Sequence, residues 1–305
     1  MNAAWSPPRL QPMPVHRFDA HTRAHLFRPS PHGATDPVLG VDLFHMPHPT
    51  FQPHPHAGMS AVTYLLPESP GGIRNRDSRG DDSLIAPGDL HWTQAGRGMV
   101  HEEVPAEPGV EAFGVQVFVN LPAAHREAEP AVFKVAAAEM PVWASAGVTV
   151  RVVAGEWLGL ASPLAKAPDW WTRLTVLDVT LAAGALGSFN VPSGWNALGL
   201  LVSGRLGPAS PAEGEAGWQA SGPVAIVSGA ETPLEMDSPV LLAAGPEGAR
   251  LVWLMGPARR EVTVQWGPFA GNSRAQIQQW AWAHQAGQMG HLEPLGGPAP
   301  ETQSD

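Results

Sequence analysis

Short apolar runs separated by glycine and proline dominate this chain, and their rhythm limits the folds open to it. Gly and Pro each occur 33 times among 305 residues. Turn residues recur at intervals of roughly ten residues, as they do between short strands. Four runs have the β-branched or alternating pattern of a strand, namely 61–66, 113–119, 148–153 and 174–181. Many short strands joined by tight turns are typical of a sandwich or barrel, so we predict an all-β protein.

The length of the chain leaves room for one large domain or for two of roughly 150 residues each. A stretch rich in Ala, Glu and Pro at 122–141 replaces the strand pattern, and the rhythm of strands and turns then begins again. We therefore predict two β-barrels of similar plan in tandem. The expected division is an N-terminal domain at 1–135, a C-terminal domain at 136–265, and a strand, helix and tail at 266–305.

One α-helix is expected near the C-terminus. Ser273 and Gln276 have the spacing of a capping box, in which each side chain satisfies the other residue's free backbone amide. Ile277 and Trp280 follow at helical spacing, and Gly287 is suited to end the helix. The pattern predicts a short helix that docks through an apolar face.

Composition excludes several classes of function. The net charge is −10, only Lys134 and Lys166 represent lysine, and no basic run is present, so we expect no direct nucleic-acid binding. The chain has no cysteine, which excludes disulfides and thiolate-bound metals. Residues 1–10 lack the pattern of a signal peptide, and no apolar run is long enough to span a bilayer. We expect a cytoplasmic protein that does not cross a membrane.

The histidines are concentrated in the first third of the chain. Ten of the thirteen lie at or before His101, and none lies between residues 126 and 283. Imidazole is the most common metal ligand among protein side chains. A metal site is therefore expected in the first barrel, and the second barrel is expected to have none.

Two triplets have the spacing of metal ligands, His54-Pro55-His56 and His101-Glu102-Glu103. Residues i and i+2 of a strand point to the same face, so each triplet can aim two side chains at one point. Two facing strands can then bring together His54, His56, His101 and Glu103. Three imidazoles and a carboxylate suit Fe, Mn, Co, Ni or Zn.

The alternative is that these histidines are solvated and bind no metal. Histidines in a proline-rich loop are often only solvated, and His45 and His48 show how common such spacing is in this part of the chain. The first triplet alone would therefore define no site. The second triplet, with its carboxylate spacing, favours a metal site, while His91 and Glu102 remain candidates for surface positions.

Several segments of the chain resemble the pirin family. The resemblance rests on His54-Pro55-His56-Ala57-Gly58, Val62-Thr63-Tyr64, Arg76-Asp77-Ser78, Pro87–Glu103 with its Ala-Gly-Arg-Gly-x-x-His-x-Glu motif, Phe118–Pro122, Trp266–Phe269, Asn272-Ser273, Ile277 and Gly287–Gly290. Pirins are proteins with two cupin (jelly-roll) barrels, of which the first binds one iron through three His and one Glu. The resemblance implies His54, His56, His101 and Glu103 as metal ligands, and a second barrel without metal.

The chain departs from the family pattern beside the first triplet. Pirins commonly continue His-Pro-His with Arg-Gly-Phe-Glu, and this chain has Ala57-Gly58-Met59-Ser60 there. The missing Arg and Glu would change the rim of the site or a partner surface.

The resemblance implies two functions of different classes. Some pirins are similar to quercetin 2,3-dioxygenases, which would make this chain an iron-dependent dioxygenase for a flavonol-like aromatic substrate. Glu103 would then be both ligand and catalytic base, accepting the substrate hydroxyl's proton. Pirins are also known as regulators that act through protein partners, which would make it a non-enzymatic, metal- or redox-responsive protein. We expect a monomer that binds one divalent transition metal. Iron is the expected ion, with Ni, Mn, Co and Zn as alternatives.

Overall fold

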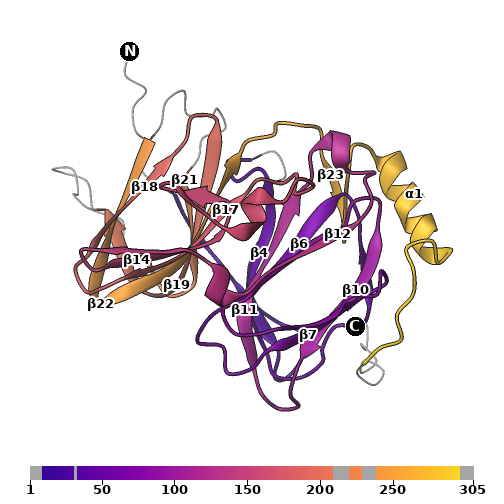
Figure 1. The fold of residues 1–305 in the computed structure, drawn as a ribbon, viewed down its shortest axis with the longest axis horizontal. Helices are drawn as coiled ribbons and strands as arrows, with labels where there is room; N and C mark the ends of the chain where they lie inside the picture. The colour runs from indigo at the N-terminus through magenta and orange to yellow at the C-terminus, as the bar shows by residue number, and fades with distance from the viewer. Residues whose placement is uncertain (1–8, 31–32, 209–219, 229–237, 296–305) are drawn as a thin grey trace. The chain divides into compact units, whose positions relative to one another are not determined.

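A computed structural model describes residues 9–30, 33–208, 220–228 and 238–295, and strands make up most of it (Figure 1). The described residues contain one α-helix and three short 3-10 helices, η1 (Ala123–His125), η2 (Ala137–Glu139) and η3 (Pro163–Lys166). No helix among them combines the length and the apolar character needed to cross a membrane.

The chain divides into two compact units, and both are discontinuous in sequence. The histidine-rich unit comprises Val15–Leu26, Gly40–Ala137 and Glu261–Asp305. The apolar unit comprises Met1–Pro14, Phe27–Leu39 and Ala138–Arg260. Each is described by itself below.

Two sheets form the body of the histidine-rich unit. A seven-stranded sheet has the order β12-β9-β6-β11-β4-β3-β2, and a four-stranded sheet has the order β5-β10-β7-β8. The bounds of these strands are β2 Val15–Arg17, β3 Arg23–Phe27, β4 Val38–Met46, β5 His54–His56, β6 Met59–Leu65, β7 Ile73–Asp77, β8 Asp82–Ile85, β9 Leu90–Gln94, β10 Met99–Pro105, β11 Ala112–Asn120 and β12 Ala131–Val135.

Antiparallel register places polar residues on one face of the four-stranded sheet. Strand β10 pairs with β5, opposing His101 to His54, and with β7, opposing Glu103 to Asn75. Directly opposed residues share a face, and so do residues two apart on one strand. His56 therefore lies on this face as well.

The apolar unit is built on one nine-stranded sheet. Its main order is β1-β21-β19-β22-β17-β14-β13, with β18 paired to β22 and β20 to β19. The bounds are β1 Arg9–Pro12, β13 Val142–Ser145, β14 Val148–Ala154, β17 Thr175–Leu181, β18 Leu186–Val191, β19 Trp195–Pro208, β20 Ala220–Ser221, β21 Val224–Ser228 and β22 Ser238–Pro257, and a separate hairpin joins β15 Glu156–Trp157 to β16 Leu160–Ala161.

Valine, leucine and aromatic side chains fill the apolar unit. Its core cluster includes Val150, Leu177, Phe189 and Trp253, all at most 1% exposed. Alternate residues of β14 and β17 belong to this core, so one face of each strand is buried in it: Val148, Val150 and Val152 from β14, and Leu177, Val179 and Leu181 from β17.

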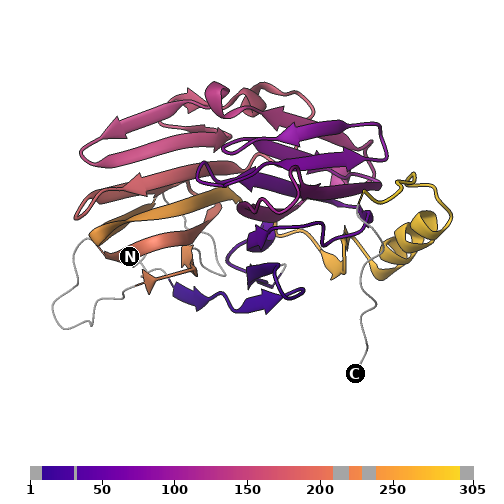
Figure 2. The same cartoon turned by 90° about the horizontal axis from the view of Figure 1, so that it is seen from below.

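The C-terminal residues complete the histidine-rich unit. Strands β23 (Val264–Trp266) and β24 (Phe269–Gly271) form a hairpin beside α1 (Arg274–Gln285), as Figures 1 and 2 show. Ser273 caps α1 by accepting a hydrogen bond from the Gln276 amide at 3.2 Å. The Gln276 side chain instead accepts from the Asn272 amide at 2.7 Å, so the expected reciprocal capping box is only half formed.

The strand pattern of the sequence is largely confirmed. The four predicted runs correspond to β6, β11, β14 and β17, and the predicted helix is α1 with Ile277 and Trp280 buried. The stretch at 122–141 was expected to lack strands, and this is wrong. It contains η1, β12 and η2, and β12 pairs with β9.

Candidate metal centre

Three histidines converge inside the histidine-rich unit. Ligand nitrogens of His54, His56 and His101 all lie within 4.8 Å of one another. The ring centroids are 4.7 Å apart for His54 and His101, and 5.0 Å apart for each of the other two pairs. Among the described residues, no other group of three His, Cys, Asp or Glu side chains converges in this way.

Backbone carbonyls orient two of the three rings. Nδ1 of His54 lies 2.9 Å from the carbonyl oxygen of Gln52, and Nδ1 of His56 lies 3.4 Å from that of Pro268. A ring that donates its Nδ1 proton to a carbonyl keeps the lone pair of Nε2 for another partner. Metal-binding histidines are commonly fixed in this manner.

His101 carries the strongest sign that a ligand belongs here. The residue is 3% exposed, and neither ring nitrogen has a hydrogen-bond partner among the described residues. A buried polar group without a partner is costly, because it has lost its hydrogen bonds to water. A metal ion bound to one of these nitrogens would remove part of that cost.

The electrostatics favour neutral imidazoles. Burial lowers the pKa of His54. Burial, and repulsion by His54, lower the pKa of His56 to about 3. Burial and the neighbouring histidines likewise hold the pKa of His101 well below its usual value. At neutral pH all three rings are thus in the form that binds metal.

Glu103 lies on the same face but outside the group of three histidines. Both of its carboxylate oxygens are 2.8 Å from the hydroxyl of Thr63, which donates to one of them at a time. The same hydroxyl lies 2.8 Å from Oε1 of Gln116, while Nε2 of Gln116 is buried without a partner. With its amide turned over, Gln116 would donate to Thr63, and Thr63 to Glu103. Burial raises the pKa of Glu103.

The donor set fits a transition metal. The structure brings together the three predicted histidines and keeps the predicted carboxylate two residues from His101 on the same strand face. Neutral imidazoles with a carboxylate nearby suit Fe, Mn, Co, Ni or Zn better than Mg or Ca, which prefer oxygen donors throughout. The three histidines are therefore placed to bind one metal ion.

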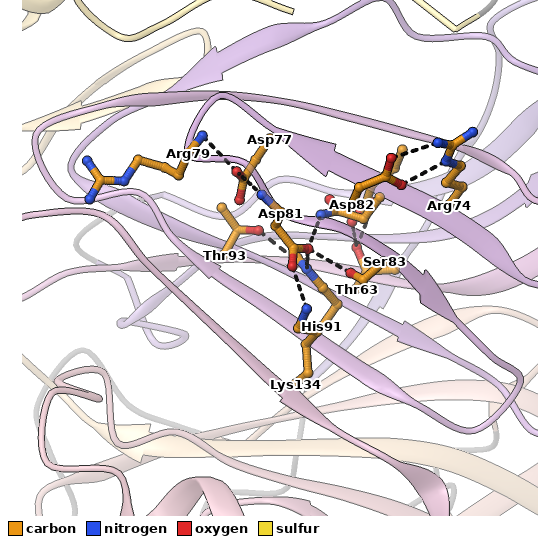
Figure 3. Close-up of polar contacts among 12 residues, drawn as sticks. Thr63, Arg74, Asp77, Arg79, Asp81, Asp82, Ser83, His91, Thr93 and Lys134 are labelled. Carbon is orange, nitrogen blue, oxygen red and sulfur yellow. Dashed lines mark hydrogen bonds and ion pairs between the residues drawn. The ribbon is translucent and has the colours of Figure 1, made fainter.

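A second polar cluster surrounds Asp81 (Figure 3). Its Oδ2 accepts hydrogen bonds from Asn75 at 3.0 Å and Ser83 at 2.6 Å, and lies 3.4 Å from Nε2 of His91. Lys134 forms an ion pair with the other carboxylate oxygen. The hydrogen bond with His91, together with Lys134, holds the pKa of Asp81 far below its usual range. The interior of this unit is thus polar beyond the histidines.

The two residues considered as surface positions are both buried. His91 is 1% exposed and lies against Asp81. Glu102 is also 1% exposed, forms a 2.7 Å ion pair with Arg76 and accepts a hydrogen bond from the Leu295 amide at 3.0 Å. Alternation along β10 turns Glu102 away from the side of His101 and Glu103, toward the C-terminal residues.

One departure from the family pattern, Ala57, also lies beneath the C-terminal residues. Ala57 is fully buried in a cluster that includes Val100 and Trp280. Gly58 has a φ of 70°, and a Cβ there would lie 1.9 Å from the carbonyl oxygen of Ala270. Ala57 is therefore covered by the C-terminal residues and forms no part of a free surface.

Sequence reasoning missed the residues that hold the candidate ligands. Thr63 and Gln116 lie 40 and 53 residues from their partners, and the Pro268 carbonyl lies 212 residues from His56. Thr63 stood within the family resemblance, but as a strand residue without a role. No spacing rule connects positions this far apart before the strand register is known.

The chain matches two family models. Residues 24–119 match the model described as Pirin, and residues 176–290 match the model described as Pirin C-terminal cupin domain. Human pirin is 34% identical over 249 residues, covering 80% of this chain and 79% of pirin. Pirin-like protein 2 of Arabidopsis thaliana is 33% identical over 254 residues, covering 79% of this chain and 72% of that protein. A Pseudomonas aeruginosa protein, provisionally named quercetin 2,3-dioxygenase, is 32% identical over 251 residues, covering 80% of this chain and 83% of its own.

Solved structures share the fold. A quercetin 2,3-dioxygenase from Acinetobacter baumannii has a TM-score of 0.75 at 24% identity, covering 93% of this chain and 99% of its own. A bacterial pirin from Escherichia coli in complex with nickel(II) has a TM-score of 0.58 at 13% identity, covering 82% of this chain and 99% of its own. The predicted fold class, all-β with two jelly-roll cupin barrels and a short C-terminal helix, is confirmed. With two family models matched and relatives more than 30% identical along most of their length, this chain belongs to the pirin family.

Proposed function

We propose that this chain is a metal-dependent dioxygenase of the quercetin 2,3-dioxygenase type, with one iron ion held by His54, His56, His101 and Glu103. The observation that carries the proposal is the convergence of three neutral imidazoles, the half-buried His54 and the buried His56 and His101, of which His101 has no hydrogen-bond partner at either nitrogen among the described residues. Such a group is costly without a ligand and well suited to a transition metal.

Different residues of the chain orient the ligands, accept the substrate proton and position the base. A bound ion would supply open coordination positions for a substrate oxygen and for dioxygen. Gln52 and Pro268 fix the rings of His54 and His56 through their carbonyls. Glu103 accepts the proton of the substrate hydroxyl, and Thr63 holds the carboxylate in position. Burial raises the pKa of Glu103, which makes it a stronger base once it is ionised.

The proposed substrate is a flavonol-like aromatic compound. The support is the name of the Pseudomonas aeruginosa relative, which is 32% identical along most of its length. In this assignment the metal chemistry lies within residues 1–135, and residues 136–265 form a barrel without metal.

A second function is favoured by a different observation. Strand β10 turns His101 and Glu103 to one face and Glu102 to the other, where Glu102 binds Arg76 and the Leu295 amide. Arg76 also donates a hydrogen bond to the Glu293 carbonyl. A change of charge at the metal would therefore reach the C-terminal residues through one strand. This arrangement suits a metal- or redox-responsive regulator that acts through protein partners.

Oxygen uptake separates the two functions. Iron-loaded protein is mixed with a panel of flavonols, and oxygen consumption is followed with an electrode while the loss of flavonol absorbance is recorded. The dioxygenase proposal expects uptake that depends on both iron and flavonol. Fully iron-loaded protein that consumes no oxygen with any flavonol would contradict it and leave the regulatory function.

A further inference from the structure

The apolar unit contains a cavity that the metal chemistry does not use. Its volume is about 550 Å³, within the range of sites that bind small organic molecules. The described residues around it come from β13, β14, β15, β17, β18, β19 and β22 and the turns beside them, all within this unit. None of the candidate metal ligands is among them.

Aromatic rings form much of the cavity wall. Trp143, Trp157, Phe189 and Trp195 all line it. The rings of Trp143 and Trp157 are 5.5 Å apart and nearly perpendicular, at 85°. Trp157 and Phe189 lie 6.4 Å apart at 29°. Rings set at right angles present a face and an edge to the same space, which suits a flat guest with ring atoms of its own.

Two leucines extend this apolar surface to the solvent. Leu158 is 67% exposed and Leu186 is 60% exposed, and both line the cavity. Leu158 also has a φ of 47°, in the left-handed region that is unfavourable for a large side chain. Exposed leucines and a strained backbone are costly in the free protein, and both recur at binding sites.

The charge of the cavity selects among guests. Glu156 is the one ionisable residue among the described lining residues, and it is exposed to solvent. No lysine, arginine or histidine stands among them to attract an anion. The whole chain carries a net charge of −10. Indole faces are themselves attractive to cations, because the π-electrons concentrate negative charge there.

We propose that this cavity binds a flat aromatic cation, which stacks among the tryptophans with its positive charge directed at Glu156. The site is independent of the proposed dioxygenase function, because it shares no residue with the metal centre and favours a charge that a flavonol does not carry.

Three probes of nearly equal shape test the assignment on the metal-loaded, full-length protein. N-methylacridinium is the cation, acridine at mildly alkaline pH is its neutral counterpart, and acridine-9-carboxylate is the anion. Binding is measured by calorimetry and by the fluorescence of each probe. We expect one cation per chain, bound about tenfold more tightly than acridine, with the anion weakest.

Variants locate the bound probe. Glu156→Gln should weaken binding of the cation about fivefold and leave that of acridine unchanged, whereas Glu139→Gln, at another exposed site of the same unit, should change neither. Trp143→Leu should weaken both probes. Circular dichroism checks folding, and Glu156→Gln carries the test if the tryptophan variant does not fold.

Any one of the following results would overturn the proposal. The first is no binding of the cation at millimolar concentration. The second is equal affinity for the cation and for acridine, or a cation affinity that Glu156→Gln leaves unchanged. The third is loss of binding in His101→Ala, which would move the probe to the histidines.

Discussion

The histidine-rich unit buries imidazoles, carboxylates and amides between its two sheets, whereas the apolar unit fills its interior with Val, Leu, Phe and Trp. Asn75, Asp77 and His101 are each at most 3% exposed in the first, and Val150, Leu177 and Trp253 are fully buried in the second. Both units are built from the same short antiparallel strands. The difference shows that the cupin plan tolerates either interior, and that a few inward positions decide which barrel can hold a metal.

The largest expected effect concerns catalysis in the histidine-rich unit. Glu103→Gln preserves size and an oxygen donor but removes the charge and nearly all basicity. We expect the variant to keep much of its metal and to lose flavonol-dependent oxygen uptake by about two orders of magnitude, the usual range for a general base. Glu107→Gln, on the exposed stretch after β10, is the control and should retain full activity. Unchanged uptake in Glu103→Gln would remove Glu103 from the mechanism.

The next effect concerns the C-terminal residues that complete the same unit. At Gly58 an added Cβ would meet the Ala270 carbonyl, in addition to the strain of its positive φ. We expect Gly58→Ala to destabilise the histidine-rich unit by about 3 kcal/mol or more in urea unfolding. Gly80→Ala, with a φ of 100° and no atom within 4 Å of its Cβ, isolates the backbone strain and should cost about 1 kcal/mol. An equal loss of stability in the two variants would contradict the close packing of Gly58 against the Ala270 carbonyl.

In the metal-free protein, acid should destabilise the histidine-rich unit more than the apolar unit. The pKa values of His54, His56 and His101 are lowered by folding, so these residues take up protons more readily when unfolded. Stability is therefore unaffected above pH 6.5, falls as the pH drops below it, and keeps falling toward the His56 pKa of about 3. Each group contributes up to about 1.4 kcal/mol per pH unit.

Urea unfolding at a series of pH values measures this effect. The transition of the histidine-rich unit should move to lower urea as the pH falls below 6.5, and bound metal should move it to higher urea at neutral pH, because the ion binds the folded protein. The apolar unit has no histidine among its described residues, so its transition should move much less. Two transitions that shift together would count against the comparison.

Individual strands such as β6 and β11 and the pairs of ligands could be predicted from sequence because both depend on short-range patterns. His54 with His56, and His101 with Glu103, are two residues apart and need only a strand to share a face. The contacts of Thr63, Gln116 and the Pro268 carbonyl depend on register between distant strands, which no local pattern encodes. The same holds for β1, which pairs with β21 across more than half of the chain.

The smallest expected effect concerns the apolar unit. Glu156 is a carboxylate in a barrel without imidazoles among its described residues, and isolated carboxylates bind iron poorly. Glu156→Gln should therefore leave the metal content unchanged by elemental analysis. A fall in metal content would indicate that the apolar unit binds an ion through Glu156, which would contradict this prediction.

The central claim is that one transition-metal ion binds in the histidine-rich unit at His101 and its two neighbouring histidines. Elemental analysis of purified, metal-loaded wild type and His101→Ala tests it most directly, since the substitution removes a buried donor that no other imidazole is positioned to replace among the described residues. The account predicts close to one ion per chain in the wild type and a sharp loss in the variant. Two ions per chain, or equal loading of both proteins, would contradict it.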